Sequence, residues 1–178
     1  SIGIGSGGGV GKVTAEWLMT GHINEDIFSY DIKRFQKFHS ELGFIKKRIT
    51  ESLGDLYGMH WPFKQHKTSR NVKTLPHHDN LKSFGACFGV SAGYERPMWF
   101  ALDGEKSEYE YSYNYQNWYP SAEYETNNTI KNVGLFDLTP FSKFEIKSDT
   151  AHQELQKICT ANIKNEPGKC VYTHMLNP

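Results

Sequence analysis

Residues 84–119 read FGACFGVSAGYERPMWFALDGEKSEYEYSYNYQNWY and are rich in aromatic side chains. Aromatic residues pack well on a pleated surface, so strands are predicted to dominate this segment. Within it, residues 108–113 alternate charged or hydroxyl side chains with tyrosines, the period of two of a strand packed on one face. Interleaved aromatics can also stack on single-stranded nucleic acid, but Glu105, Glu108 and Glu110 would repel its phosphates. We therefore expect a sheet here and no nucleic-acid partner.

Helical patterns precede this aromatic segment. Residues 41–57 repeat apolar side chains on one face and carry charges elsewhere, which predicts an amphipathic helix packed on the core. Its apolar face comprises Leu42, Ile45, Ile49, Leu53 and Leu56. A shorter helix is predicted after Asp31, because this carboxylate can accept hydrogen bonds from the free N–H groups of a first turn.

Short helices and strands are also predicted after the aromatic segment. Residues 121–132 are typical of a polar helix, and Asp149-Thr150 is expected to cap another helix, which carries Leu155, Ile158 and Cys159. Three further segments are strand candidates: 133–138, 144–146 and 170–172. Helices and strands together indicate an α+β protein.

Residues 1–11, SIGIGSGGGVG, contain six glycines, which predicts a turn that makes close backbone approaches. A helix follows at once and is expected to end at Gly21. A glycine turn before a helix exposes backbone N–H groups and the positive end of the helix dipole, and so suits an anionic or carbonyl-bearing ligand. The segment lacks the Walker fingerprint, because Lys12 is followed by Val13 instead of Ser or Thr. From the pattern alone, a structural turn and a ligand cradle are both open.

Composition narrows the classes of partner. Lys plus Arg balances Asp plus Glu at 20 each, so the chain has no overall positive field for nucleic acid or anionic lipid. No stretch approaches the roughly 18 apolar residues of a transmembrane helix, and no membrane insertion is expected. Cys87, Cys159 and Cys170 fit neither a paired disulfide framework nor zinc spacing, which favours a reducing compartment, the cytoplasm of a bacterium or the mitochondrial matrix. Small molecules are the expected partners.

Residues 58–82 are expected to form a long surface connection, because they contain two prolines and little apolar periodicity. Four histidines lie in it: His60, His66, His77 and His78. They have no His-x-x-x-His spacing on a helix and no carboxylate-rich sequence around them, so scattered surface histidines are preferred to a metal site.

Six segments occur in an order that resembles the dimethylglycine and sarcosine dehydrogenases: GSGGGVGKVTAEWLMTG (5–21), DIKRF (31–35), RNVKTLPHHDNLKSFGACFGVSAGYERPMWFA (70–101), YQNW (115–118), VGLFDLTPFSKFEI (133–146) and VYTHMLN (171–177). The resemblance covers essentially the whole chain. It implies an internal fragment of a longer protein, in three parts. Residues 1–22 would end an amine-oxidase-like FAD-binding domain, 23–125 would form a linking α+β domain with an antiparallel sheet, and 126–178 would begin an aminomethyltransferase-like folate-binding domain.

The resemblance also implies where cofactors bind. The flavin of FAD would lie against the backbone of a glycine-rich segment made of Gly3, Ile4, Gly5, Ser6, Gly7, Gly8 and Gly9. Tyr172, Met175 and Leu176 would approach the pterin of tetrahydrofolate. Tyr94, Glu95, Arg96, Pro97 and Trp99 would be structural. No catalytic residue is expected in the chain, because the family's amine-binding side chains and folate-activating acid would lie outside it.

The implied activity is the oxidation of dimethylglycine or sarcosine by FAD, with the one-carbon unit passed to tetrahydrofolate and the electrons to an unspecified acceptor. An alternative is a non-catalytic protein that resembles the regulatory subunit of pyruvate dehydrogenase phosphatase. A third interpretation, a folate-dependent methyltransferase without oxidation, is disfavoured by the N-terminal glycine turn.

Overall fold

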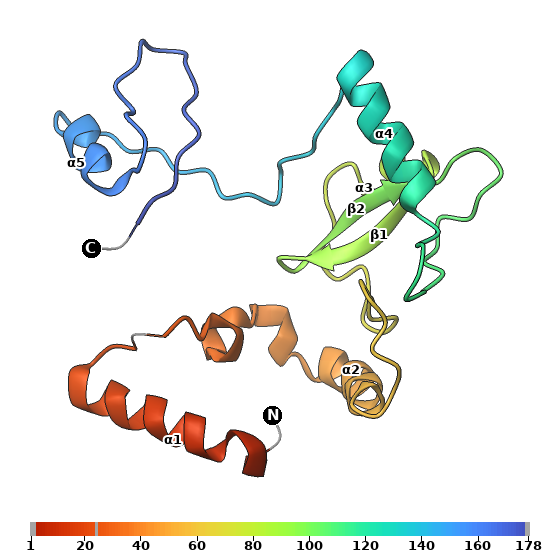
Figure 1. Cartoon of the computed structure of the whole chain (residues 1–178), viewed down its shortest axis with the longest axis horizontal. Helices are drawn as coiled ribbons and strands as arrows, with labels where there is room; N and C mark the ends of the chain where they lie inside the picture. Colours follow the sequence, from red (N-terminus) through yellow and green to blue (C-terminus); the bar gives the residue numbers. More distant parts are fainter. Residues whose placement is uncertain (1–2, 24, 177–178) are drawn as a thin grey trace. The chain divides into compact units, whose positions relative to one another are not determined.

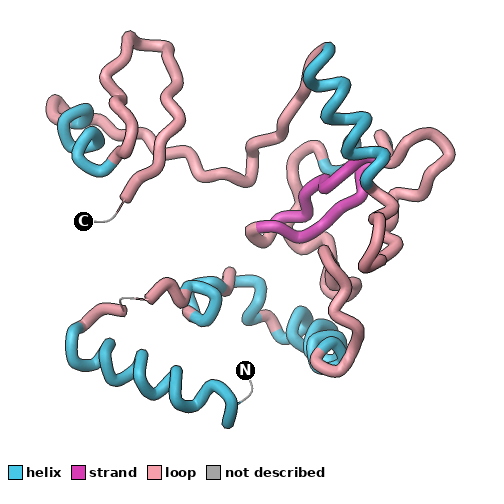
Figure 2. Tube along the Cα trace, in the orientation of Figure 1, coloured by secondary structure: helices cyan, strands magenta, loops and turns pink. Residues whose placement is uncertain are grey.

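The computed structural model describes residues 3–23 and 25–176, and its contacts divide the chain into two units, Ser1–Leu135 and Phe136–Pro178. Each unit is described by itself. Helices and one two-stranded antiparallel sheet are present, which agrees with the expected α+β class (Figures 1 and 2). No helix in the described ranges is both long and apolar enough to cross a membrane.

The sheet of the first unit is a hairpin of β1 (Ala86–Ser91) and β2 (Tyr94–Phe100). Ala92 and Gly93 form its two-residue turn, with φ angles of 51° and 78°. Positive φ at both turn positions matches the right-handed twist of the strands, which is why such turns are favoured in short hairpins. Of the segment 84–119, in which strands were predicted to dominate, residues 86–91 and 94–100 form strands.

Two helices pack against this hairpin. The short helix α3 (His78–Ser83) contacts both strands, and α4 (Tyr119–Lys131) contacts β2. The Phe100 N–H donates to Glu125 of α4 at 2.8 Å, which ties the end of β2 to that helix. The buried apolar side chains are Leu75, Ala86, Cys87 and Trp99. The helix predicted at 121–132 is confirmed by α4.

The strand predicted at residues 108–113 is wrong: the segment joins no sheet. Tyr109 and Tyr111 do lie on one side, with their rings stacked at 5.6 Å, as the alternation requires. The backbone of the segment, however, bonds to the side chain of Asn117, which accepts from Glu110 N–H at 3.1 Å and donates to Glu108 O at 2.9 Å. Period-two patterning determines which side chains share a face, whereas a strand also needs the edge of a neighbouring strand.

The helix α2 (Leu42–Asp55) confirms the amphipathic helix predicted at 41–57. Its apolar stripe is not packed as expected, because Leu42, Ile49 and Leu56 remain 64%, 51% and 59% exposed. Charged side chains elsewhere on α2 bond to residues 67–69, and Phe44 packs against Phe38 and His39 of η3, whereas the residues of the stripe stay exposed in the described part of the chain.

Three 3-10 helices precede α2: η1 (Phe28–Tyr30), η2 (Ile32–Arg34) and η3 (Lys37–Ser40). Asp31 begins η2, and its carboxylate accepts from Lys33 N–H at 2.8 Å, as predicted. A 3-10 turn suits this segment because each short helix ends in extended backbone, at Asp31, Phe35 and Glu41.

The N-terminal segment forms the helix α1 (Gly3–Thr20), so the turn predicted over residues 1–11 is wrong from Gly3 onward. Gly21, with φ of 76°, ends the helix as predicted, and its N–H donates to Trp17 O at 2.8 Å. A Cβ added to Gly3, Gly7, Gly8 or Gly9 would meet no atom within 4 Å. No close approach therefore forces a turn, and hydrogen bonds within the segment determine a helix.

The second unit contains one helix, α5 (Ala151–Ile158), as predicted after Asp149-Thr150. The predicted side-chain cap is wrong: Thr150 is the residue at the N-cap, but its hydroxyl bonds to Ser148 and not to a first-turn N–H. The strands predicted at 133–138, 144–146 and 170–172 are absent among the described residues. Instead, a single antiparallel bridge joins Cys159 to Met175. These short apolar segments have no neighbouring strand with which to complete a ladder.

Candidate functional site

The residues predicted to bind FAD lie on α1 and are exposed except for Ser6, which is half-buried; Ile4 is fully exposed. Their N–H groups beyond the first turn serve hydrogen bonds within the helix, so they do not form a cradle in this chain. The first turn of α1 carries no acidic residue, which leaves the positive end of the helix dipole uncompensated.

The residues predicted to bind folate lie together on the last described segment of the second unit. Tyr172, Met175 and Leu176 are 88%, 62% and 60% exposed. The segment is held to the end of α5 by Leu176 N–H, which donates to Ile158 O at 3.0 Å, and by Thr160 N–H, which donates to His174 O at 3.0 Å.

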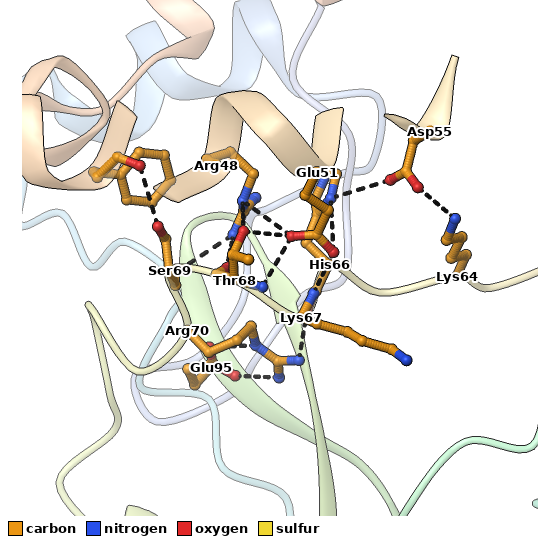
Figure 3. Close-up of polar contacts among 11 residues, drawn as sticks. Arg48, Glu51, Asp55, Lys64, His66, Lys67, Thr68, Ser69, Arg70 and Glu95 are labelled. Atoms are coloured by element: carbon orange, nitrogen blue, oxygen red, sulfur yellow. Dashed lines mark hydrogen bonds and ion pairs between the residues drawn. The ribbon is translucent and has the colours of Figure 1, made fainter. Parts of the chain in front are cut away.

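The most highly connected polar group of the first unit joins α2 to residues 67–69, and we call it the α2 clamp (Figure 3). Glu51 of α2 accepts from Lys67 N–H at 2.6 Å, from Thr68 N–H at 2.9 Å, and from the Thr68 hydroxyl. Burial alone would raise the pKa of Glu51, but these hydrogen bonds outweigh it and lower the pKa to about 2. Glu51 is therefore a carboxylate at neutral pH.

Arg48, one turn earlier on α2, completes the clamp. Its guanidinium donates to the Thr68 and Ser69 carbonyls, and Nε donates to the Thr68 hydroxyl at 3.3 Å. The Ser69 hydroxyl in turn donates to Phe44 O at 3.2 Å. A segment without regular structure is thus held in place by side chains of a helix, which satisfies its backbone polar groups.

A second polar group attaches residues 70–71, in the connection between α2 and α3, to the hairpin. Arg70 donates through Nε and Nη2 to the two carboxylate oxygens of Glu95, at 2.7 and 2.5 Å, and to Phe88 O at 2.9 Å. Glu95 is only 2% exposed and also accepts from Asn71 N–H at 2.8 Å. Burial raises the pKa of Glu95, but its bonds with Arg70 and Asn71 hold it below the ordinary value. This bidentate geometry explains how a charge is tolerated in the core.

Sequence reasoning missed the partner of Glu95. Glu95 and Arg96 were expected only to be structural, and the structure pairs Glu95 with Arg70, 25 positions away. Adjacent residues of a strand point to opposite faces, a signal that disfavours the neighbour as partner. The structural role expected for Glu95 agrees with this burial.

Folding also brings His66 beside two carboxylates that the local sequence did not place near it. His66 Nδ1 lies 3.8 Å from Glu51 and 3.6 Å from Asp55, and all three could offer ligand atoms to a metal ion. Both carboxylates already have other partners, however: Glu51 holds the clamp, and Asp55 lies 2.5 Å from Lys64 Nζ. The two carboxylates therefore serve first as partners of the clamp and of Lys64.

A cavity of about 870 Å³ lies between the connection, β1 and residues 106–111. Its wall includes Cys87 and Phe88 of β1 together with the stacked rings of Tyr109 and Tyr111. The Tyr111 hydroxyl accepts from Gln65 N–H at 2.8 Å, which fixes that ring against the connection. The volume of this cavity is within the range of ligand sites in proteins.

Comparison with known families accounts for the order of these elements. Residues 20–74, which contain the 3-10 helices, α2 and the clamp, match the FAD dependent oxidoreductase central domain. Residues 77–178, with the hairpin and the second unit, match the GCVT N-terminal domain, and the chain belongs to that family.

Several relatives match nearly the whole chain. It is 41% identical over 95% of its length to 4-methylaminobutanoate oxidase (formaldehyde-forming) of Paenarthrobacter nicotinovorans. It is 32% identical over 99% to the mitochondrial pyruvate dehydrogenase phosphatase regulatory subunit of Mus musculus, and 29% identical over 100% to the mitochondrial dimethylglycine dehydrogenase of Rattus norvegicus. The chain spans only 20%, 21% and 21% of these relatives, respectively.

Proposed function

We propose that the chain is part of a flavin-dependent oxidoreductase that demethylates a small N-methylated amino acid. The observation that carries the proposal is the order of the two matched domains, an FAD dependent oxidoreductase central domain at 20–74 followed at once by a GCVT N-terminal domain at 77–178. This order suits a protein that oxidises an N-methyl group at one site and transfers the one-carbon unit at another. FAD would accept the hydride, and tetrahydrofolate would take up the one-carbon unit.

Within this proposal, the glycine-rich segment Gly3–Gly9 contacts the flavin. Negative charge develops on the flavin as it accepts a hydride, and a helix N-terminus directed at that charge stabilises it. The first turn of α1, which lacks acidic side chains, is electrostatically suited to this role. Tyr172, Met175 and Leu176 contact the folate. The same proposal places the end of the FAD-binding domain near residue 22 and the start of the folate-binding domain near residue 125.

Dimethylglycine and sarcosine are the proposed substrates, and both carry an N-methyl group next to a carboxylate. A second candidate is 4-methylaminobutanoate, which the 41% identity to the oxidase from Paenarthrobacter nicotinovorans favours. It has the same two functional groups, separated by a longer aliphatic chain. The electrons would pass to an acceptor in the bacterial cytoplasm or the mitochondrial matrix.

The test is a dye-reduction assay on the full-length protein that contains this chain. A yellow protein with flavin absorbance should reduce an artificial acceptor with sarcosine, dimethylglycine or 4-methylaminobutanoate, and the ratio of kcat/KM values identifies the substrate. Tetrahydrofolate should divert the product from free formaldehyde to the folate. A colourless preparation that reduces no dye would contradict the proposal. It would favour the regulatory alternative, which is motivated by the 32% identity to the regulatory subunit from mouse.

A further inference from the structure

We infer that the cavity beside β1 binds a planar aromatic ring that carries two or more negative charges; its lining shares no residue with the segments proposed to contact flavin and folate. The inference rests on three features of the cavity: its size, its aromatic wall, and the lysines at its edge. Each of them follows from the folded arrangement of the first unit.

The lysines give the cavity a positive potential. Lys67, Lys82 and Lys106 contribute to its lining, and their side chains are exposed to solvent. Glu108 is the one carboxylate among its lining residues. The charge of Arg70, which also lines the cavity, is balanced by Glu95. Three lysines against one carboxylate therefore leave a net positive charge that attracts an anion.

The ionisable side chains of Tyr109 and Cys87 add no negative charge to that of Glu108. Burial raises the pKa of Tyr109 to about 12 and that of Cys87 to about 11. Both groups are therefore neutral at physiological pH.

The aromatic side chains provide a surface for a flat ring. Tyr109 and Tyr111 are stacked with an interplanar angle of 7°, and each remains partly exposed. His78 and Phe88 form a second ring pair in the lining, with centroids 4.2 Å apart. Offset stacking on such faces is favourable for planar ligands. The cavity of about 870 Å³ also has room for a ring and several charged groups.

The negative charges could be phosphates, as on a nucleotide, or carboxylates, as on an aromatic acid conjugated to glutamate. Titration calorimetry of the chain at low ionic strength distinguishes the two sources with ADP and 4-aminobenzoyl-triglutamate as probes. Adenosine supplies the ring without charge, and tripolyphosphate supplies charge without the ring. At least one of the first two probes should bind more tightly than either control, and the tighter one identifies the source.

Variants connect the binding to the cavity. The double variant Lys82→Gln with Lys106→Gln should weaken binding about tenfold, since two charges near the anion are removed. Lys131→Gln is the matched control, because Lys131 is an exposed lysine of α4 that does not line the cavity, and it should leave affinity unchanged. Tyr109→Leu should weaken ADP but not tripolyphosphate, with circular dichroism used to verify folding.

Three results would overturn the inference. The first is no detectable binding of either ring-bearing anion, and the second is tripolyphosphate binding as tightly as ADP and 4-aminobenzoyl-triglutamate. The third is an equal loss of affinity in Lys131→Gln and in the double variant, which would indicate a general charge effect of the surface.

Discussion

At the scale of single residues, the decisive contacts hold a connection that has little regular structure of its own. Glu51 and Arg48 of α2 bond to the backbone at 67–69, and Glu95 of β2 binds Arg70 and Asn71. The bonds of Glu51 and Arg48 lie within the segment matched to the oxidoreductase central domain, whereas those of Glu95 connect that segment with the hairpin of the GCVT N-terminal domain. These hydrogen bonds join residues 16 or more positions apart, so no local sequence pattern predicts them.

Glu51→Gln should lower the free energy of unfolding of the first unit by about 1–3 kcal/mol, because a charge-assisted acceptor of three hydrogen bonds becomes a neutral amide. Urea denaturation followed by tryptophan fluorescence measures the loss. Glu123→Gln, at an exposed position of α4, is the matched control and should change stability by less than about 0.5 kcal/mol. Equal effects of the two substitutions would mean that the clamp is not stabilising.

Acid should weaken the same clamp. The pKa of Glu51 is about 2 in the folded chain and 4.5 in its ordinary state, so the folded form holds its proton less tightly than the unfolded form. The resulting stability is fully present above pH 4.5 and is lost as the pH falls toward 2. Urea midpoints measured across this range should decline more steeply for the natural chain than for Glu51→Gln. Parallel curves would show that Glu51 does not contribute.

At the scale of elements, the hairpin turn is sensitive to an added side chain at Gly93. Gly93 has φ of 78°, and a Cβ added there would overlap with the amide of Gln36. That amide donates to Ala92 O at 2.7 Å, so a hydrogen bond joins the turn to the segment before α2. The turn thus needs glycine for its backbone angle, and a Cβ there would force the flexible Gln36 amide to move and give up this hydrogen bond.

Gly93→Ala should therefore destabilise the first unit by more than the roughly 1 kcal/mol that positive φ alone imposes on an alanine. Gly104→Ala is a matched control for the angle, because Gly104 has φ of 86° and open space around the missing Cβ. The difference between the two free energies of unfolding isolates the Gln36 contact. If Gly104→Ala costs as much as Gly93→Ala, the contact with Gln36 has no energetic effect.

Elements also differ in how far a local pattern predicts them. The helices α2 and α4, the end of α1 at Gly21 and the capping by Asp31 follow from periodicity and local hydrogen bonds, and each was predicted. The strands expected at 108–113 and after residue 132 did not form, because a strand requires a partner edge that a local pattern cannot supply.

At the scale of the whole chain, the structure leaves much apolar surface uncovered. The stripe on α2 is more than half exposed at most positions. Leu135, the last residue of the first unit, is 100% exposed, and Phe144 of the second unit is 86% exposed. Contiguous apolar surface of this kind marks a surface that another structural element covers. The chain spans about a fifth of its relatives, which is consistent with burial of such surface in a longer protein.

The chain of 178 residues by itself should not retain FAD. The segment Gly3–Gly9 is part of the exposed helix α1, where most of its N–H groups are already bonded. Equilibrium dialysis or flavin fluorescence should detect no stoichiometric binding, whereas the full-length protein serves as the positive control. Tight binding by this chain alone would mean that the glycine-rich segment leaves the helix and forms the turn that its composition first suggested.

The sequence by itself determined the amphipathic helices, the aromatic content of the hairpin region and the family, because these depend on periodicity and on the identity and order of residues. Only the tertiary structure decided that Glu95 binds Arg70, that His66 meets two carboxylates, and that Tyr109 and Tyr111 line a cavity with three lysines. The conformation of the glycine-rich segment was also decided by the structure and not by the sequence. Its composition permits both a turn and a helix, because glycine has little conformational preference of its own, and the structure shows a helix from Gly3 onward.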